Sequence, residues 1–214
     1  MPAKVVPLKF VTDDSYYSGQ RKDSMALIKA KAISSALEIG GGAFDTLSAV
    51  KSIYGCEAWG VDLVDAGNGE GINFIKGSFE DSRIQGQLPD SFFDLIIAND
   101  VIEHLVDTKL FFDACAAKLA PNGTLIMSVP NIRNLRTIYY VFAKGTFPRL
   151  PSGLFDRTHL RWFTKSDVLT HSSSLFDLVE SKVVGRLVPR FLENSLFAEL
   201  LGIHMLFSFQ KKRN

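Results

Sequence analysis

The segment Leu37-Glu38-Ile39-Gly40-Gly41-Gly42-Ala43-Phe44 decides the fold of this chain. The apolar run Ala36–Ile39 has the character of a strand end, and three glycines stop it. Positions 44–54 then show the helical spacing of apolar residues. Because glycine has no Cβ, such a turn lets the backbone approach a ligand, and the helix N-terminus adds free N–H groups. We therefore expect a strand, a ligand-binding turn and a helix.

Apolar runs alternate with helical patterns along the remaining chain, which is typical of βαβ units and a parallel sheet. The continuous run Phe93–Ala98 predicts a central strand buried on both faces. The triplet Pro121–Gly123 predicts a turn, and Thr164 with Asp167 predicts a helix capping box. Further strands are expected at Ala58–Val61, Ile72–Ile75, Thr124–Val129, Phe176–Val184 and Met205–Gln210, and further helices at about Asp107–Leu119, Leu135–Phe142 and Arg190–Leu201.

The region 131–163 interrupts this rhythm. It combines a helical stretch with several glycines and prolines between residues 145 and 153. A loop of this length in a compact domain is usually functional, so we expect a small lid or substrate insertion after the fifth strand. The whole chain, 1–214, is expected to form one domain, with residues 1–33 as an N-terminal cap region.

The composition is that of an ordinary globular protein. The 214 residues fit one domain, 46% are hydrophobic and 22% are charged. A formal net charge of +1 gives no sign of a nucleic-acid partner. Cys56 and Cys115 form no C-x-x-C pair or metal-ligand cluster, so we expect buried free thiols and no metal. A signal-peptide core and a long apolar stretch are both absent, which predicts a cytoplasmic protein without a membrane span.

Two classes of ligand compete for the glycine turn. A dinucleotide fold needs G-x-G-x-x-G, but the sixth position here is Asp45, whose carboxylate repels a pyrophosphate. Glu38 before Gly40 and Gly42 instead suits a cationic ligand, although an ordinary strand-to-helix turn would need the same glycines. Asp62 lies 22 positions after Gly40, near the spacing at which an acid binds ribose hydroxyls. A nucleoside with a cationic group is therefore favoured.

Five segments carry a family resemblance that covers nearly the whole chain. They are ALEIGGG from residue 36, GVDLV from residue 60, FIKGSFED from residue 74, FDLIIANDVIEHLVD from residue 93 and LAPNGTLIMSVPN from residue 119. In this combination the chain resembles class I S-adenosylmethionine (SAM)-dependent methyltransferases. The closest branch is the type 11/12 small-molecule group, which includes glycan-associated and ubiquinone-biosynthesis enzymes.

The resemblance implies both a fold and a cofactor. The fold is α/β, a Rossmann-like, seven-stranded, mostly parallel sheet with helices on both faces, an antiparallel last strand and a small lid after strand 5. The cofactor is SAM, with S-adenosylhomocysteine (SAH) as its product.

The resemblance also implies a cofactor site, with two departures from the family pattern. Ser78 stands where an acid often holds the adenine amino group. Phe44 stands where a third glycine is usual, and we expect it to pack against the cofactor or narrow its entry. Arg21 is expected to pair with the methionine carboxylate of SAM, or else to lie exposed at a helix start. The expected cofactor contacts are Tyr16, Arg21, Glu38, Gly40, Gly41, Gly42, Asp62, Leu63, Ser78, Phe79, Glu80, Asn99, Asp100 and Val101.

Two histidines are candidates for proton transfer. His104 ends the run N-D-V-I-E-H, and its ordinary pKa suits a general base near neutral pH, whereas orienting the following loop is the alternative role. His159 lies in D-R-T-H-L-R, which resembles a segment of the glycan-associated branch. Arg157, His159 and Arg161 are expected on one side of this segment, where they bind an anionic or sugar-phosphate acceptor. The alternative is a structural brace in which Asp156 holds an arginine. His159 is the alternative base.

The expected function is SAM-dependent methylation, and the branch suggests an oxygen atom of a small molecule or glycan as acceptor. A non-catalytic, methyltransferase-like binding protein and a nicotinamide-dependent oxidoreductase are the alternatives. A nucleic-acid methyltransferase is disfavoured, because N-D-V-I stands where amino-group base methylators have D/N-P-P-[YF]. The choice between monomer and homodimer stays open.

Overall fold

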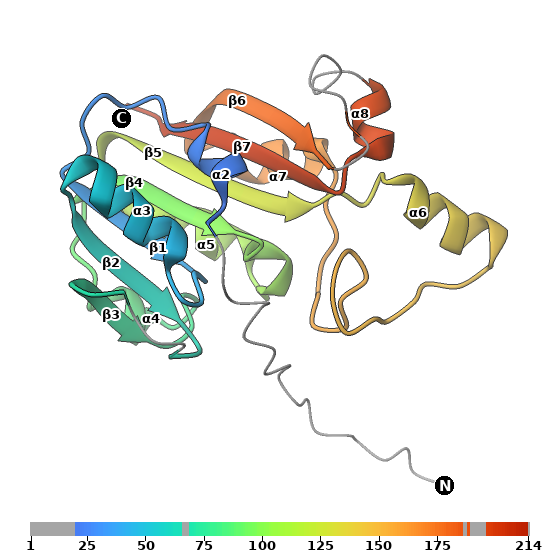
Figure 1. Cartoon of the computed structure of the whole chain (residues 1–214), viewed down its shortest axis with the longest axis horizontal. Helices are drawn as coiled ribbons and strands as arrows, with labels where there is room; N and C mark the ends of the chain where they lie inside the picture. The colour runs from blue at the N-terminus through green and yellow to red at the C-terminus, as the bar shows by residue number, and fades with distance from the viewer. Residues whose placement is uncertain (1–19, 66–68, 186–187, 189–195, 214) are drawn as a thin grey trace, which may run out of the picture.

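A computed structural model describes residues 20–65, 69–185, 188 and 196–213 of the chain. They form an α/β fold around one seven-stranded sheet (Figure 1). The strand order is β3-β2-β1-β4-β5-β7-β6, and β7 runs antiparallel to both of its neighbours while the other pairs are parallel. The predicted Rossmann-like sheet is therefore confirmed. Its strands are β1 Ser35–Ile39, β2 Glu57–Asp62, β3 Ile72–Lys76, β4 Phe93–Asn99, β5 Leu119–Pro130, β6 Phe176–Val184 and β7 His204–Lys211.

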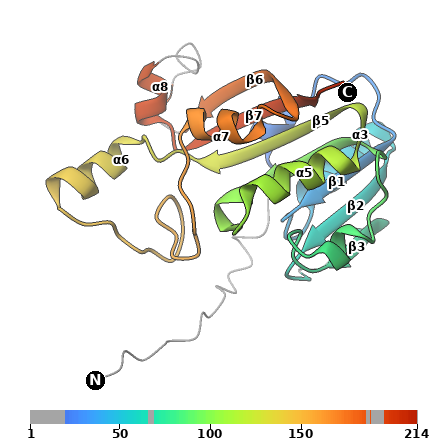
Figure 2. The same ribbon diagram turned by 180° about the vertical axis from the view of Figure 1, so that it is seen from behind.

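Helices cover both faces of the sheet. α2 (Lys22–Met25) and α3 (Asp45–Tyr54) lie on the face seen in Figure 1, and α5 (Thr108–Lys118) and α7 (Lys165–Ser172) lie on the opposite face (Figure 2). No helix among the described residues has both the length and the apolar composition that a membrane crossing requires. The shorter elements are α4 (Ser82–Gln85), the 3₁₀ turn η1 (Ile102–His104), α6 (Leu135–Ile138), the π-helical turn η2 (Tyr139–Ala143) and α8 (Leu196–Leu201).

The central strand β4 separates two hydrophobic cores. Leu95 and Ile97 belong to the core that includes Leu47 of α3. Ile96 belongs to the other core, which includes Phe112 of α5. Successive side chains of a strand point to opposite faces, so a strand covered on both sides must be apolar at every position. This explains the uninterrupted apolar run that predicts β4.

One strand boundary differs from its prediction. The turn expected at Pro121–Gly123 lies inside β5, which begins at Leu119 rather than at Thr124. Asn122 has a φ of 63°, in the left-handed region, and the register between β4 and β5 shifts near this point. The turn residue therefore produces an irregularity within a strand pair instead of ending the strand.

The insertion after β5 is closed at its base. Asn131 and Phe163 form an isolated parallel bridge, so the two ends of the predicted insertion 131–163 meet. The predicted capping box of Thr164 and Asp167 then starts α7. Between these ends, α6 and η2 project away from the sheet and the chain returns as an irregular loop (Figure 1). Tyr16, and the part of the predicted last helix that precedes Leu196, lie outside the described residues.

Candidate cofactor and acceptor site

The glycine turn joins β1 to α3 at the carboxyl edge of the parallel strands, where ligands bind in open α/β sheets. Gly40 has a φ of 68°, which favours glycine. A Cβ at this position would also lie 2.7 Å from the side chain of Val101. Gly40 is exposed whereas Gly42 is buried, so the bare backbone of Gly40 is available to a ligand.

Phe44 fills the core beneath this turn. Its side chain is fully buried, and its ring meets Phe74 edge to face with centroids 5.8 Å apart. Added Cβ atoms at Gly41 and Gly60 would lie 2.4 Å and 2.7 Å from the same ring. The expectation that Phe44 narrows the entry of the cofactor is wrong, because the ring occupies space that both glycines leave free.

Glu38 lies behind the turn with 3% of its surface exposed. Its Oε2 accepts a hydrogen bond from the backbone N–H of Leu47 at 3.0 Å. Burial raises the pKa of Glu38 to about 8 despite this hydrogen bond, and the nearby carboxylates of Asp45 and Asp62 also raise it. The carboxyl group is therefore mostly protonated at pH 7, and a cation bound beside it would favour the ionised form.

Asp62 closes the turn from the end of β2. Its Oδ2 accepts a hydrogen bond from the N–H of Gly42 at 2.8 Å, and its Oδ1 accepts one from Val64 at 2.9 Å. Each carboxylate oxygen keeps a further lone pair that a ribose hydroxyl can use. The neighbouring Leu63 is 58% exposed. The structure thus brings Asp62 and Leu63 beside the glycine turn, as the sequence predicts.

The segment after β3 is held by its own hydrogen bonds. Ser78 Oγ accepts from the N–H of Glu80, and Glu80 Oε1 accepts from the N–H groups of Val106 and Asp107 at 2.9 Å and 2.8 Å. Phe79 is buried and packs edge to face on the ring of a core phenylalanine. Glu80 therefore ties this segment to the loop after η1, while adenine contacts by Ser78, Phe79 or Glu80 stay a prediction.

Arg21 lies against the end of β4. Its Nη1 donates to Asp100 Oδ2 at 2.5 Å, and its Nη2 donates to Ser128 Oγ at 3.2 Å. Burial opposes the ionisation of Asp100, but His204 and Arg21 hold the pKa of Asp100 below its ordinary value. Arg21 is thus part of a charged cluster, which excludes the alternative of an isolated exposed arginine. Its contact with a methionine carboxylate stays a prediction.

Asn99 supplies an unsatisfied donor in the same place. Its Oδ1 accepts a hydrogen bond from Ser24 Oγ at 2.6 Å. Its Nδ2 is buried and has no hydrogen-bond partner among the residues that the structure describes. Buried polar atoms are rarely left without a partner, so this amide is suited to a ligand acceptor.

Together these groups fit SAM. The backbone of Gly40 and the lone pairs of Asp62 suit an adenosine ribose, and the Nδ2 of Asn99 suits a carboxylate or hydroxyl oxygen. Glu38 suits the cationic end of the ligand. When bound, SAM supplies a methyl group that is already activated by its sulfonium.

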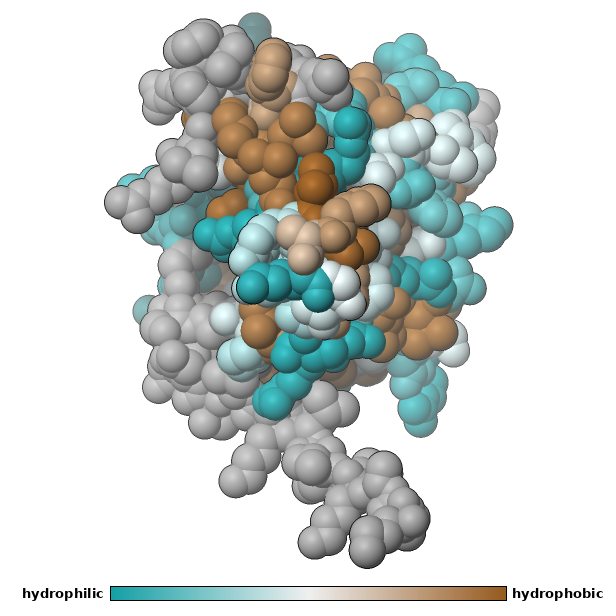
Figure 3. All heavy atoms as spheres, turned by 90° about the vertical axis from the view of Figure 1, so that its right-hand side faces the viewer, coloured by the Kyte–Doolittle hydropathy of each residue, from teal (hydrophilic) through white to brown (hydrophobic). Residues whose placement is uncertain are grey.

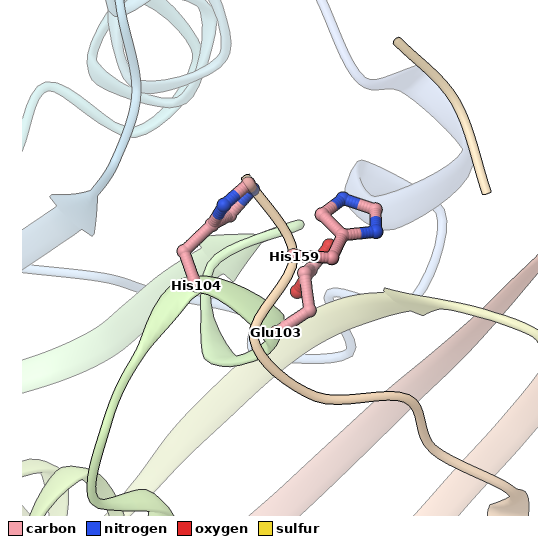
Figure 4. Close-up of side chains that lie close together, drawn as sticks. All are labelled: Glu103, His104 and His159. Carbon is pink, nitrogen blue, oxygen red and sulfur yellow. The ribbon is translucent and has the colours of Figure 1, made fainter. Parts of the chain in front are cut away.

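Three further side chains meet beside η1 (Figure 4). Glu103 and His104 belong to η1, whereas His159 comes from the loop of the insertion. The two imidazole rings lie edge to face, with centroids 4.8 Å apart. His104 Nδ1 lies 3.3 Å from the carbonyl oxygen of Thr158, and His159 Nδ1 lies 3.2 Å from that of Leu154. A carbonyl oxygen only accepts, so both Nδ1 atoms carry the hydrogen and both Nε2 lone pairs are free to accept a proton.

The carboxyl group of Glu103 is buried beside the two imidazole rings. It is 1% exposed, and neither carboxylate oxygen has a hydrogen-bond partner within the described part of the chain. Burial, followed by the charge of Asp100, raises the pKa of Glu103 well above its ordinary value. Burial also lowers the pKa of His159, with His104 as a further cause. Glu103 and His159 therefore favour their neutral forms in this structure.

The same three groups offer ligand atoms for a metal ion, because those atoms all lie within 4.8 Å of one another. Two imidazoles and a carboxylate are ligands that transition metals accept. The sequence predicts no metal site, and no local pattern indicates this cluster. Glu103 and His104 are adjacent in sequence, but only the folding of the insertion adds His159.

The segment from Arg157 to Arg161 is irregular, so its charged residues do not share one side as expected. His159 is 4% exposed, whereas Arg157, Leu160 and Arg161 are exposed. The guanidinium of Arg161 donates to the carbonyl oxygens of Leu105 and Val106. Arg161 thus braces the loop through backbone carbonyls, while Asp156 Oδ1 accepts hydrogen bonds from Thr158. Acceptor recognition by Arg157, His159 or Arg161 stays a prediction.

Comparison with known proteins identifies the class. Residues 17–169 match a family model described as a methyltransferase domain. The chain therefore belongs to this methyltransferase family. The predicted class, a class I SAM-dependent methyltransferase with SAM as its cofactor, is confirmed. The alternative of a nicotinamide-dependent oxidoreductase is not supported.

Individual proteins resemble parts or all of the chain. It is 38% identical to a ubiquinone biosynthesis O-methyltransferase of Bradyrhizobium diazoefficiens over 86 residues, which are 38% of this chain and 32% of that protein. It is 49% identical over 63 residues to the protein of the same name from Nitrobacter winogradskyi, covering 28% and 24% of the two chains. The chain thus matches about a third or less of the length of these relatives.

Solved structures share the fold. The N-methyltransferase NodS from Bradyrhizobium japonicum, in complex with SAH, aligns with a TM-score of 0.60 at 17% identity, covering 95% of both chains. A SAM-dependent methyltransferase from Archaeoglobus fulgidus aligns with a TM-score of 0.61 at 18% identity, covering 95% of this chain and 99% of the other.

Proposed function

We propose that the protein transfers the methyl group of SAM to an oxygen atom of a small-molecule acceptor, with His104 as general base. The observation that carries this proposal is the contact of His104 Nδ1 with the carbonyl oxygen of Thr158 at 3.3 Å. This contact leaves the Nε2 lone pair free beside the end of β4, where the cofactor groups Asn99 and Asp100 lie. An imidazole in this state accepts a proton near neutral pH.

The residues of the chain bind the two reactants, orient them and accept one proton. Gly40, Asp62 and Asn99 hold the cofactor, while Glu38 balances its positive charge. As the new C–O bond forms and the S–C bond breaks, the acceptor hydroxyl gives its proton to His104 Nε2. Holding the two reactants in line and excluding water supplies much of the rate in such a displacement.

The relatives support oxygen as the accepting atom, because both are named as O-methyltransferases of ubiquinone biosynthesis. We infer a hydroxyl-bearing ring compound of that kind as the acceptor class. A sugar or glycan hydroxyl is the second candidate, favoured by the D-R-T-H-L-R segment at residues 156–161. Its arginines, Arg157 above all, are exposed and suit an anionic acceptor.

Two measurements test the proposal. Thermal shift with SAM, SAH and NAD tests the cofactor, since a ligand at 100 times its Kd stabilises by about 2.7 kcal/mol. Methyl transfer from labelled SAM is then measured on catechol-type and sugar acceptors. Stabilisation by SAM and SAH but not NAD, with labelled catechol ether formed, is the expected result. Binding of SAM without transfer to any hydroxyl would favour the non-catalytic alternative.

A further inference from the structure

The helix formed by α6 and η2 presents an apolar stripe to solvent. Leu135, Ile138, Tyr139 and Phe142 repeat at i, i+3, i+4 and i+7, which places them on one helix face. Their exposed fractions are 47%, 41%, 50% and 83%. A helix that packs on its own protein buries such a stripe, whereas these four side chains stay exposed in the described structure.

The opposite side of this helix holds it in place. The ring of Tyr140 meets Phe155 edge to face at 5.4 Å, and Phe155 meets Phe147 at 5.1 Å. Phe147 in turn contacts Trp162 at 4.8 Å. This aromatic group fixes the helix to the returning loop, so the apolar stripe keeps its outward direction.

The segment that carries the stripe has basic residues and no acidic ones. The stretch 131–155 contains four basic residues and no aspartate or glutamate. Arg133 pairs with Glu199, and Arg149 donates to the carbonyl oxygen of His159 and lies over the ring of Trp162. Arg136 and Lys144 are exposed and have no carboxylate partner among the described residues. Lys144 Nζ lies 5.7 Å from the ring centroid of Tyr139. Lys144 therefore borders the apolar face directly.

We propose that this helix docks on the surface of a bilayer that contains anionic phospholipids. The apolar stripe would enter the headgroup boundary, and Arg136 and Lys144 would lie beside lipid phosphates. The helix projects from the end of the sheet, so the contact does not require any other element to move (Figure 1). Figure 3 views this end of the molecule and shows hydrophobic side chains next to hydrophilic ones at the surface.

The positive charge beside the apolar stripe favours an anionic membrane over a second copy of the chain as the binding partner. A two-fold interface repeats the same patch on both subunits, which would bring the cations of one helix near those of the other. An anionic bilayer meets the same cations with opposite charge. The inference does not depend on the acceptor or on methyl transfer, because it concerns residues that the proposed chemistry does not use.

Vesicle sedimentation of the full chain tests the proposal. Vesicles of phosphatidylcholine alone are compared with vesicles that contain phosphatidylglycerol. We expect at least tenfold tighter binding to the anionic vesicles, a loss of that difference in high salt, and a further tenfold weakening by Phe142→Asp. The double variant Arg136→Glu/Lys144→Glu should remove the lipid preference. Ile53→Asp is the matched control, because Ile53 is 64% exposed on α3, and it should bind as the unaltered protein does.

Three results would overturn the proposal. The first is no sedimentation with either vesicle. The second is binding that Phe142→Asp and Ile53→Asp weaken equally. The third is a dimer by light scattering that Phe142→Asp dissociates while vesicle binding is absent, which would assign the stripe to a second copy. A thermal shift with SAM, measured on each variant, separates these outcomes from a failure of the proposed function.

Discussion

The imidazole ring of His159 lies edge to face against that of His104, with 4.8 Å between their centroids, and so joins the insertion to the end of β4. The pair links the segment that is expected to hold the acceptor with the segment that borders the cofactor. Because only His104 is half-buried while His159 is 4% exposed, the roles of the two rings differ. We therefore expect His104 to reach an acceptor and His159 to orient the ring of His104.

Replacing His104 by alanine should lower kcat about 10²- to 10⁴-fold, which is the usual contribution of a general base. The Kd for SAM should change less than twofold, because the ring is not among the cofactor contacts. His159→Ala should give a smaller loss of kcat, and kcat should still fall on the acid side of the pH profile because His104 is retained. His171→Ala, an exposed histidine on α7, is the control and should leave kcat unchanged. Normal turnover by His104→Ala would remove the base role.

Glu38 should make stability depend on pH. Its pKa is about 8 in the folded chain and 4.5 in its ordinary state, so the folded chain binds more protons between these values. The free energy of unfolding therefore falls as pH rises from about 4.5 to 8, by up to about 5 kcal/mol in total. Glu38→Gln should remove most of this slope, as urea unfolding at pH 6 and pH 8 would measure. The exposed Glu70→Gln should keep it, and parallel slopes for all three proteins would contradict the buried neutral carboxyl.

We expect the buried ring of Phe44 to require glycine at position 60. A Cβ at residue 60 would lie 2.7 Å from two ring atoms, and a fully buried ring has little room to move. We expect Gly60→Ala to lower the free energy of unfolding by about 1–3 kcal/mol through overpacking. Phe44→Leu should cost stability on its own but should reduce the effect of Gly60→Ala. Additive losses in this double-mutant cycle would show that the two residues do not interact.

Much of the fold is predictable from the sequence because its signals are local. The apolar run of β4 reflects burial on both faces, and the capping box at Thr164 is contained in four residues. The start of β5 could not be predicted in this way. Asn122 and its neighbours have turn chemistry, but Leu119 and Thr124 on either side of them both pair with β4, so the strand continues through an irregularity. Tertiary contact thus overrides a local turn preference.

Some residues of the candidate site could likewise be predicted from local sequence signals, whereas others depend on tertiary contacts. Glu38, the glycines and Asp62 follow from strand ends, and parallel strands bring such ends to one edge. The core position of Phe44 could not be read, since it depends on the missing Cβ atoms of Gly41 and Gly60. The partnership of His104 with His159 likewise depends on the path of the insertion, which no periodicity specifies.

We expect the main role of the Arg161 guanidinium to be holding the insertion in place, with binding of the acceptor as the second role. It donates to the backbone carbonyls of Leu105 and Val106, which follow η1. We expect Arg161→Ala to lower the free energy of unfolding by about 1 kcal/mol and to speed proteolysis within 131–163. Arg161→Lys should restore little, because an ammonium lacks the fork that reaches two carbonyls.

Limited proteolysis and acceptor kinetics separate the two roles of Arg161. A brace predicts that cleavage rate, stability and KM change together in Arg161→Ala, while Arg136→Ala, an exposed arginine on α6, changes none of them. Direct recognition predicts a higher KM with unchanged stability and cleavage. The second pattern would show that the bonds to Leu105 and Val106 do not hold the insertion, and that the guanidinium faces the acceptor during turnover.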